Sequence, residues 1–188
     1  NQIGTYTVEV TEIGRCAKTK TIAVQPSNIA TIENIQIDDI SDNNVVTMLV
    51  LGEGNYVFAL DNPNGVYQES NVFQNVGVGF HTVYIKDIKN DCGIVSEDIA
   101  VIGYPRFFTP NNDGINDTWQ LKGISDVFQA NSQVYIYDRY GKLLRVLINS
   151  EDAWNGNING AKMPSNDYWF SAKLQDGRTF TGHFTLKR

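Results

Sequence analysis

The C-terminal stretch "DYWFSAKLQDGRTFTGHFTLKR" constrains the fold of this chain most strongly, because its apolar residues recur at every second position. Side chains alternate between the two faces of a β-strand, so this spacing places them on one face. The two predicted faces comprise Tyr168, Phe170, Ala172 and Leu174 on one strand, and Phe180, Gly182, Phe184 and Leu186 on the return strand. Asp176-Gly177 between the strands predicts a type I′ turn. The stretch therefore predicts a β-hairpin with one buried face.

A second hairpin is predicted upstream, in "QVYIYDRYGKLLRVLI", where apolar residues alternate with tyrosines and Tyr140-Gly141 marks the turn. The run "DTWQLKGI" is a further strand candidate, whereas "WNGNINGAKMPSNDY" has two Asn-Gly pairs and a proline and is predicted to be loop. Aromatic residues make up 11% of the chain, and 16 glycines accompany only 5 prolines. This mixture favours β-structure joined by tight turns. We therefore predict an antiparallel β-sandwich over residues 104–188.

An internal repeat organises the rest of the chain. Gly4 aligns with Gly79 at an offset of 75 residues, and Cys16 lies 76 residues before Cys92. A unit of this length is too long for a solenoid repeat and has the size of a small β-sandwich. The two cysteines would occupy equivalent loops of successive units. A mutual disulfide, which needs Cα atoms within about 7 Å of each other, is therefore not expected.

Residues 27–103 contain about seven short β-rich runs divided by turn signals, which is the spacing of an immunoglobulin-like β-sandwich. The pattern resembles the immunoglobulin-like or PKD-like repeats of bacterial surface proteins. Residues 1–26 would then be the C-terminal hairpin of a truncated preceding repeat. We therefore expect the chain to be a fragment of a longer protein.

The charge of the chain argues against nucleic-acid binding. Residues 1–103 carry 5 basic and 13 acidic side chains, a net charge of −8, whereas residues 104–188 carry 10 and 8, a net charge of +2. The total is −6, and non-specific affinity for nucleic acid comes from Lys and Arg on phosphates. No apolar run reaches the roughly 18 residues of a membrane-spanning helix, so we expect no membrane insertion. The change of sign near residue 103 indicates a separate C-terminal module.

The sequence contains no recognisable catalytic motif. A nucleophile elbow, a Walker loop and an H-E-x-x-H zinc motif are all missing. Gly77 and Gly79 lie between β-runs with no following helix, so they do not form a phosphate cradle. His81 and His183 fall within predicted strands. We therefore predict that the protein is not an enzyme and that it needs no cofactor, apart from the metal considered next.

The polar stretch "FTPNNDGINDTW" allows two interpretations. Calcium loops place oxygen ligands before an obligatory glycine, and Asn111, Asp113 and Asp117 around Gly114 offer such ligands. Only two carboxylates are available, however, and Gln120 stands where a bidentate glutamate would be expected. In the alternative interpretation, the Asn and Asp side chains bond to nearby backbone N–H groups and hold a turn. Calcium is the one metal that the sequence leaves open.

Several motifs in a fixed order resemble one known family. They lie in "FTPNNDGINDTW", "VYIYDRYGKLL" and "WNGNINGAKMPSNDYWFSAKLQDGRTFTGHFTLKR". Together they look like the gliding-motility-associated C-terminal domain, which is the type B sorting domain of the type IX secretion system in Bacteroidota-like bacteria. The resemblance covers about residues 107–188. Asn112 and Asn166 stand where the family commonly has glycine, and asparagine tolerates left-handed backbone angles better than most residues.

The resemblance implies a function as a secretion address. The chain would cross the inner membrane, fold, and then be recognised by the outer-membrane translocon, with a PorP/SprF-like barrel protein as partner. The protein would end at the cell surface or be secreted, and the upstream repeats would form a spacer or adhesin segment. The candidate residues for translocon recognition are Asn111, Asn112, Asp113, Gly114, Asn116, Asp117, Tyr137, Arg139, Tyr140, Gly141, Lys187 and Arg188.

Arg139 and the three tryptophans leave alternatives open. Arg139 would either contact the translocon or be held by Asp138 or a carbonyl, with a neighbouring tyrosine stacked on its guanidinium. Trp119, Trp154 and Trp169 would form an exposed patch for sugar binding, although tryptophans of a small sandwich more often belong to its core or core edge. The alternative function is therefore a stand-alone carbohydrate- or protein-binding adhesive module.

Overall fold

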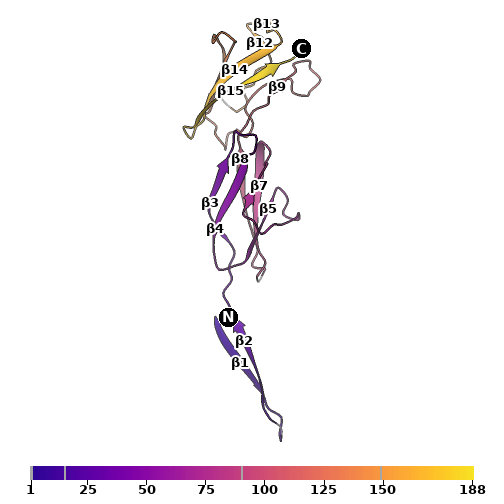
Figure 1. Ribbon diagram of the computed structural model, residues 1–188, viewed down its shortest axis with the longest axis vertical. Helices are drawn as coiled ribbons and strands as arrows, with labels where there is room; N and C mark the ends of the chain where they lie inside the picture. Colours follow the sequence, from indigo (N-terminus) through magenta and orange to yellow (C-terminus); the bar gives the residue numbers. More distant parts are fainter. Residues whose placement is uncertain (1, 15, 90, 149) are drawn as a thin grey trace. The chain divides into compact units, whose positions relative to one another are not determined.

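The computed structural model describes residues 2–14, 16–89, 91–148 and 150–188, and the regular elements in these ranges are all β-strands (Figure 1). The all-β prediction is thereby confirmed. Within the same ranges, no helix is long and apolar enough to cross a membrane. The first of two compact units comprises Asn1–Gln36, Thr47–Asn71 and Thr82–Glu97. The second comprises Ile37–Val46, Val72–His81 and Asp98–Arg188. The module bounds drawn from the sequence stay predictions.

The first unit contains a two-stranded hairpin formed by β1 (Gly4–Val10) and β2 (Lys18–Val24). The strands pair antiparallel, with Gly4 opposite Val24 and Val10 opposite Lys18. Every residue of both strands except Gly4 is exposed, including apolar side chains such as Val8. The hairpin predicted for residues 1–26 is therefore present, and it contributes no buried core residue.

Six further strands form two three-stranded sheets. One has the order β3-β4-β6 and contains β3 (Thr31–Asp38), β4 (Val45–Leu51) and β6 (Val72–Phe73). The other has the order β5-β7-β8 and contains β5 (Tyr56–Leu60), β7 (Gly79–Asp87) and β8 (Ile94–Val101). Alternate residues of β4 and β7 are buried, as a half-buried strand requires. The classification of these strands as immunoglobulin-like stays a prediction.

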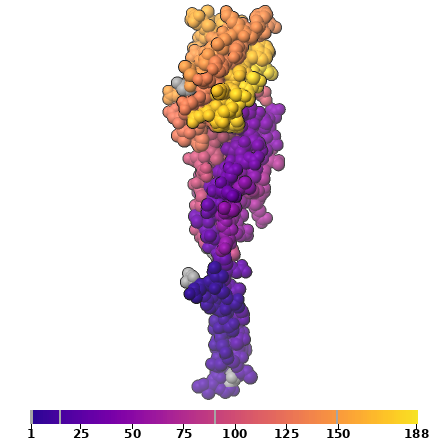
Figure 2. Space-filling view, turned by 90° about the vertical axis from the view of Figure 1, so that its left-hand side faces the viewer, coloured from indigo at the N-terminus to yellow at the C-terminus, as the bar shows by residue number. Residues whose placement is uncertain are grey.

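The C-terminal part of the second unit contains a five-stranded sheet in the order β11-β10-β14-β15-β9. Its strands are β9 (Phe107–Phe108), β10 (Gln133–Tyr137), β11 (Leu143–Leu147), β14 (Asn166–Lys173) and β15 (Thr179–Leu186). Both predicted hairpins are confirmed, because β10 pairs antiparallel with β11 and β14 with β15. The C-terminal residues, coloured yellow, lie on the face of the molecule that Figure 2 shows.

The expectation of a purely antiparallel module is wrong at one edge of this sheet. β9 runs parallel to β15, with Phe107 opposite Thr185 and Phe108 opposite Leu186. Hairpin turns impose an antiparallel direction only on strands that follow each other closely in the chain. β9 and β15 are separated by most of the module, so no local turn signal encodes their relative direction.

The turn between β14 and β15 also differs from the prediction. A type I′ turn requires positive φ at both central residues, but only Gly177 of the Asp176-Gly177 pair has one, at 90°. The Gly177 amide donates to the Leu174 carbonyl at 3.1 Å, and the Leu174 amide donates to the Arg178 carbonyl at 2.9 Å. This is the pattern of a three-residue loop that ends on a left-handed glycine.

The layer opposite the five-stranded sheet consists mainly of loops. The predicted strand "DTWQLKGI" appears only as two isolated bridges, Trp119 with Trp154 and Lys122 with Gly103. A small hairpin of β12 (Asn157–Ile158) and β13 (Ala161–Lys162) follows Trp154. Large side chains from these loops therefore close the core in place of a second long sheet.

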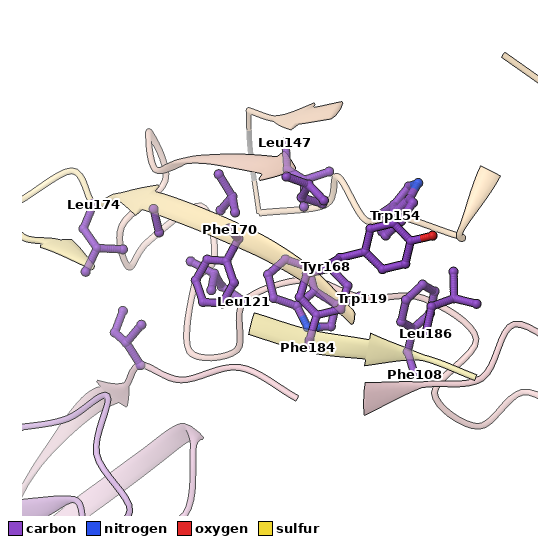
Figure 3. Packing of buried hydrophobic residues seen from close by; sticks show 14 residues of the cluster. Phe108, Trp119, Leu121, Leu147, Trp154, Tyr168, Phe170, Leu174, Phe184 and Leu186 are labelled. Carbon is purple, nitrogen blue, oxygen red and sulfur yellow. The ribbon is translucent and has the colours of Figure 1, made fainter. Parts of the chain in front are cut away.

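Aromatic residues from both layers meet in one core (Figure 3). The Trp119 ring stacks on Phe184 with centroids 3.9 Å apart, and Trp154 meets Tyr168 edge-on at 4.9 Å. The polar atoms of these rings are satisfied. The Trp119 Nε1–H donates to the Pro105 carbonyl at 2.9 Å, and the Tyr168 hydroxyl donates to the Pro164 carbonyl at 2.8 Å. Aromatic pairs of this kind add stability beyond the area they bury.

Candidate recognition surface of the C-terminal module

The loop that follows β9 is shaped by its own side chains. The Asp117 carboxylate accepts the backbone N–H groups of Asn112 at 2.6 Å and of Gly114 at 2.8 Å. The Asp113 carboxylate accepts the Ile115 N–H at 2.8 Å and the Asn111 side-chain amide at 2.7 Å. These are the Asx-type bonds that hold tight turns. The loop residues Asn112, Gly114 and Asn116 all have positive φ, between 53° and 86°.

The same bonds bear on the calcium hypothesis. The side-chain hydrogen bond from Asn111 and the backbone N–H of Ile115 lower the pKa of Asp113. Among the described residues, no group of three or more His, Cys, Asp or Glu side chains could hold a metal ion. The oxygens that would face calcium already accept N–H groups of their own loop, which favours the structural turn. Calcium binding by Asn111, Asp113 and Asp117 stays a prediction.

Millimolar calcium is expected to leave the melting temperature of the chain unchanged, because the loop carboxylates already have donors. A ligand that binds only the folded state raises the melting temperature with its concentration, so thermal unfolding with and without calcium measures the effect. Asp117→Ala serves as the matched variant. A rise in melting temperature in the native chain that Asp117→Ala abolishes would overturn the structural interpretation of the loop.

The turn between β10 and β11 is held by Asp138 and not by the Arg139 guanidinium. The Asp138 carboxylate accepts the N–H groups of Tyr140 at 2.9 Å and of Lys142 at 3.0 Å, so it serves the turn itself. Arg139 is exposed, and its guanidinium carbon lies 5.9 Å from the centroid of the Tyr140 ring. Within the described part of the chain, no hydrogen bond or ion pair of this guanidinium is present. The expectation that Asp138 or a carbonyl holds Arg139 is therefore wrong, and Tyr140 is the neighbouring tyrosine whose ring lies at cation–π distance from the guanidinium.

An aromatic row crosses the outer face of the five-stranded sheet. Tyr137 of β10 lies opposite Trp169 of β14, and Trp169 lies opposite His183 of β15. These three side chains line a shallow cleft of about 480 Å³, together with Arg139 and Gly141. Of the predicted recognition residues, Tyr137, Arg139 and Gly141 are thus brought to one place, whereas the loop of Asp113 and Asp117 does not line the cleft.

The tryptophans divide between core and surface. Trp119 and Trp154 are fully buried, which fits the core alternative, whereas Trp169 is 43% exposed, which fits the alternative of an exposed aromatic residue. Trp169 occupies the odd position between Tyr168 and Phe170, which both face the core. Strict alternation along β14 therefore turns Trp169 outward. The alternation of apolar residues in the sequence already indicates that Trp169 faces outward. The general preference of tryptophan for protein cores points the other way.

The C-terminal basic residues are structural anchors. The Lys187 ammonium lies 4.4 Å from the centroid of the exposed Phe107 ring. The Arg188 guanidinium donates to the Met163 carbonyl and to the Gly156 carbonyl, both at 3.0 Å. These contacts tie the end of β15 to the edge strand β9 and to the loop after Trp154. Their role in recognition stays a prediction.

Comparison with protein families identifies the C-terminal module. Residues 102–186 match the family described as CHU_C type IX secretion signal domain. The C-terminal module belongs to this family. The resemblance found in the sequence is thereby confirmed, and a type IX secretion signal marks its protein for export to the cell surface or beyond. Among curated protein sequences, no match is found.

A search of solved structures finds distant likenesses to components of the type IX system. The likeness to dimeric latent PorU from Porphyromonas gingivalis has 15% identity and a TM-score of 0.33, and covers 90% of this chain and 22% of that one. The likeness to PorZ, an essential surface component of the type IX secretion system of Porphyromonas gingivalis, has 17% identity and a TM-score of 0.36, and covers 89% and 26%. The chain thus spans about a quarter of these proteins.

Aromatic residues from the stretches that resemble the family build the core of the secretion signal domain. Trp119 from the first quoted stretch shares the buried cluster with Trp154 and Tyr168 from the last one. Gly156 has a φ of 76°, and a Cβ there would lie 2.7 Å from Leu186 Cδ1 and 3.0 Å from an Arg188 guanidinium nitrogen. Gly156, two residues after Trp154, is therefore a close packing position. The motif around Tyr137 and Arg139 is different, because these side chains lie at the surface cleft.

Proposed function

We propose that the C-terminal module is the address by which the type IX translocon recognises this protein. The chain crosses the inner membrane, folds in the periplasm, and is then received by an outer-membrane component of the PorP/SprF-like barrel type. The match of residues 102–186 to the secretion signal family is the observation that carries this proposal. The upstream strands form a spacer or adhesin segment of a surface protein.

The charge of the module and its surface cleft support recognition by a protein partner. Residues 104–188 carry a net charge of +2, in contrast to −8 for residues 1–103. Complementary charge accelerates encounter with an acidic surface and suppresses wrong partners. The Tyr137–Trp169–His183 row beside Arg139 adds exposed aromatic area on a rigid sheet. Recognition elements on a regular sheet keep their geometry better than elements on a loop.

Export of a reporter tests the proposal. The complete 188-residue chain, fused behind a periplasm-directed fluorescent protein in a bacterium with an intact type IX system, is expected to carry the reporter out of the cell. A fusion that lacks residues 104–188 is expected to stay in the periplasm, and a fusion that lacks residues 1–26 is expected to be exported. Retention of the complete fusion, or equal export without residues 104–188, would refute the secretion-address proposal.

The exposed Trp169 favours one alternative, an adhesive module that binds carbohydrate in its own right. Aromatic rings on an open face with hydroxyl groups nearby, here Ser171 and Thr181, suit a sugar ring. A glycan array probed with the purified chain separates the two functions. Strong binding that Trp169→Ala removes, combined with no reporter export, would favour the adhesive function.

A further inference from the structure

The outer face of the five-stranded sheet exposes aromatic side chains that the stability of the fold does not require. Trp169 is 43% exposed on β14, and its cross-strand neighbours Tyr137 and His183 extend the row over three strands. The core-facing residues of β14, Tyr168 and Phe170, are buried on the opposite face. The fold therefore gains little from Trp169. A large exposed aromatic side chain in a cleft is instead typical of a binding position.

Arg139 supplies the charged group of this cleft. Its guanidinium carbon lies 5.9 Å from the centroid of the Tyr140 ring, whereas Asp138, the acidic residue of the cleft, has its carboxylate engaged by the N–H groups of Tyr140 and Lys142. Arg139 is exposed, and in the described part of the chain its guanidinium makes no hydrogen bond or ion pair. An exposed guanidinium presents a planar fork of N–H groups, which binds a carboxylate through two parallel hydrogen bonds.

We propose that this cleft is the docking site for an extended acidic segment of the outer-membrane protein that receives the signal. A carboxylate of the segment binds Arg139, and an adjacent apolar side chain packs on Trp169 and Tyr137. This docking site rests on the proposed function, to which it adds the recognition surface and the chemistry of the partner.

The composition of the cleft favours a peptide over a glycan. Trp, Tyr and Arg are the residues that dominate the binding energy of protein interfaces when they lie together. The remaining uncharged polar side-chain groups of the lining are the hydroxyls of Ser171 and Thr181 and the His183 imidazole. A peptide needs few such groups here, because one carboxylate binds Arg139 and one apolar side chain packs on the aromatic row.

Substitutions of two cleft residues within the full chain test the docking site in cells. Arg139→Glu and Trp169→Ala are each expected to lower the exported fraction of the reporter about tenfold, which is the effect of losing one interface hot spot. Lys173→Glu is the matched control, because Lys173 is exposed on the same face of β14 but does not line the cleft. It is expected to export like the native chain. Melting curves of the purified variants show whether they fold.

The export experiment distinguishes failure of the proposed function from failure of the docking site. A native fusion that stays in the cell contradicts the proposed function itself. A native fusion that is exported, together with folded Arg139→Glu and Trp169→Ala variants that are exported equally well, overturns the docking site and leaves the proposed function standing.

Photo-crosslinking identifies the chemical class of the occupant. A benzoylphenylalanine at Thr181, which lines the cleft, is expected to give an adduct whose partner peptide contains Asp or Glu. The same group at Thr179, two residues earlier on β15, is the matched position outside the cleft. Arg139→Glu is expected to reduce the Thr181 adduct about tenfold. A glycan adduct, or equal adducts at both positions, would overturn the proposal.

Discussion

Trp119→Ala is expected to lower the free energy of unfolding of the C-terminal module by about 3–5 kcal/mol, the usual cost of removing a buried aromatic side chain. Trp119 is fully buried, stacks on Phe184 at 3.9 Å and contacts Phe170 at 5.0 Å. Its truncation leaves a cavity between the sheet and the loop layer. Small domains have a total stability of only about 5–15 kcal/mol, so the variant module would be close to unfolding.

Urea unfolding measures this effect selectively. The chain has three tryptophans, all in the C-terminal module, so the fluorescence of the remaining two reports on that module alone. Trp169→Ala is the matched control, because Trp169 is the same residue type at 43% exposure. Its cost is expected to be below about 1 kcal/mol. Equal urea midpoints for the Trp119→Ala and Trp169→Ala variants would contradict the placement of Trp119 in the core.

Gly123→Ala is the substitution with the second largest expected effect, at about 2–5 kcal/mol. Gly123 has a φ of 76°, where a side chain clashes with its own backbone, which costs about 1–2 kcal/mol. A Cβ at this position would also lie 2.4 Å from the Val101 carbonyl oxygen. That atom belongs to backbone and cannot rotate away, so the chain itself must shift.

A second glycine separates the two causes. Gly160 has a φ of 80°, but a Cβ there would meet no atom within 4 Å. Gly160→Ala is therefore expected to cost only the backbone contribution of about 1–2 kcal/mol. The difference between the urea midpoints of the two variants measures the clash with Val101. A Gly160→Ala variant as unstable as the Gly123→Ala variant would show that the close approach at Gly123 is not present.

The sequence predicted the local elements of the C-terminal module well. Period-two alternation placed β10, β11, β14 and β15, and turn residues such as Tyr140-Gly141 marked their connections. The same signal failed for "DTWQLKGI", which contributes only isolated bridges. A segment with alternating apolar and polar residues can still lie in a loop layer. The alternation indicates which side chains are buried, but it does not determine which backbone segment pairs with this one.

The candidate site was predictable only in part. The motif around Tyr137 and Arg139 was visible in the sequence, and both residues line the cleft. Trp169 and His183 complete that cleft from two other strands, and no spacing along the chain links them to Arg139. The register of β10, β14 and β15 brings them into one row.

The sequence by itself determined the all-β class, the two C-terminal hairpins and the membership of the module in a secretion signal family, because strand alternation, turn chemistry and motif order are properties of neighbouring residues. The tertiary structure alone decided that β9 runs parallel to β15, that Gly123 lies against Val101, and that Trp169 lies in one cleft with Arg139. Each of these depends on segments far apart in the chain. Their relative placement follows from burial of the shared aromatic core, which no local pattern encodes.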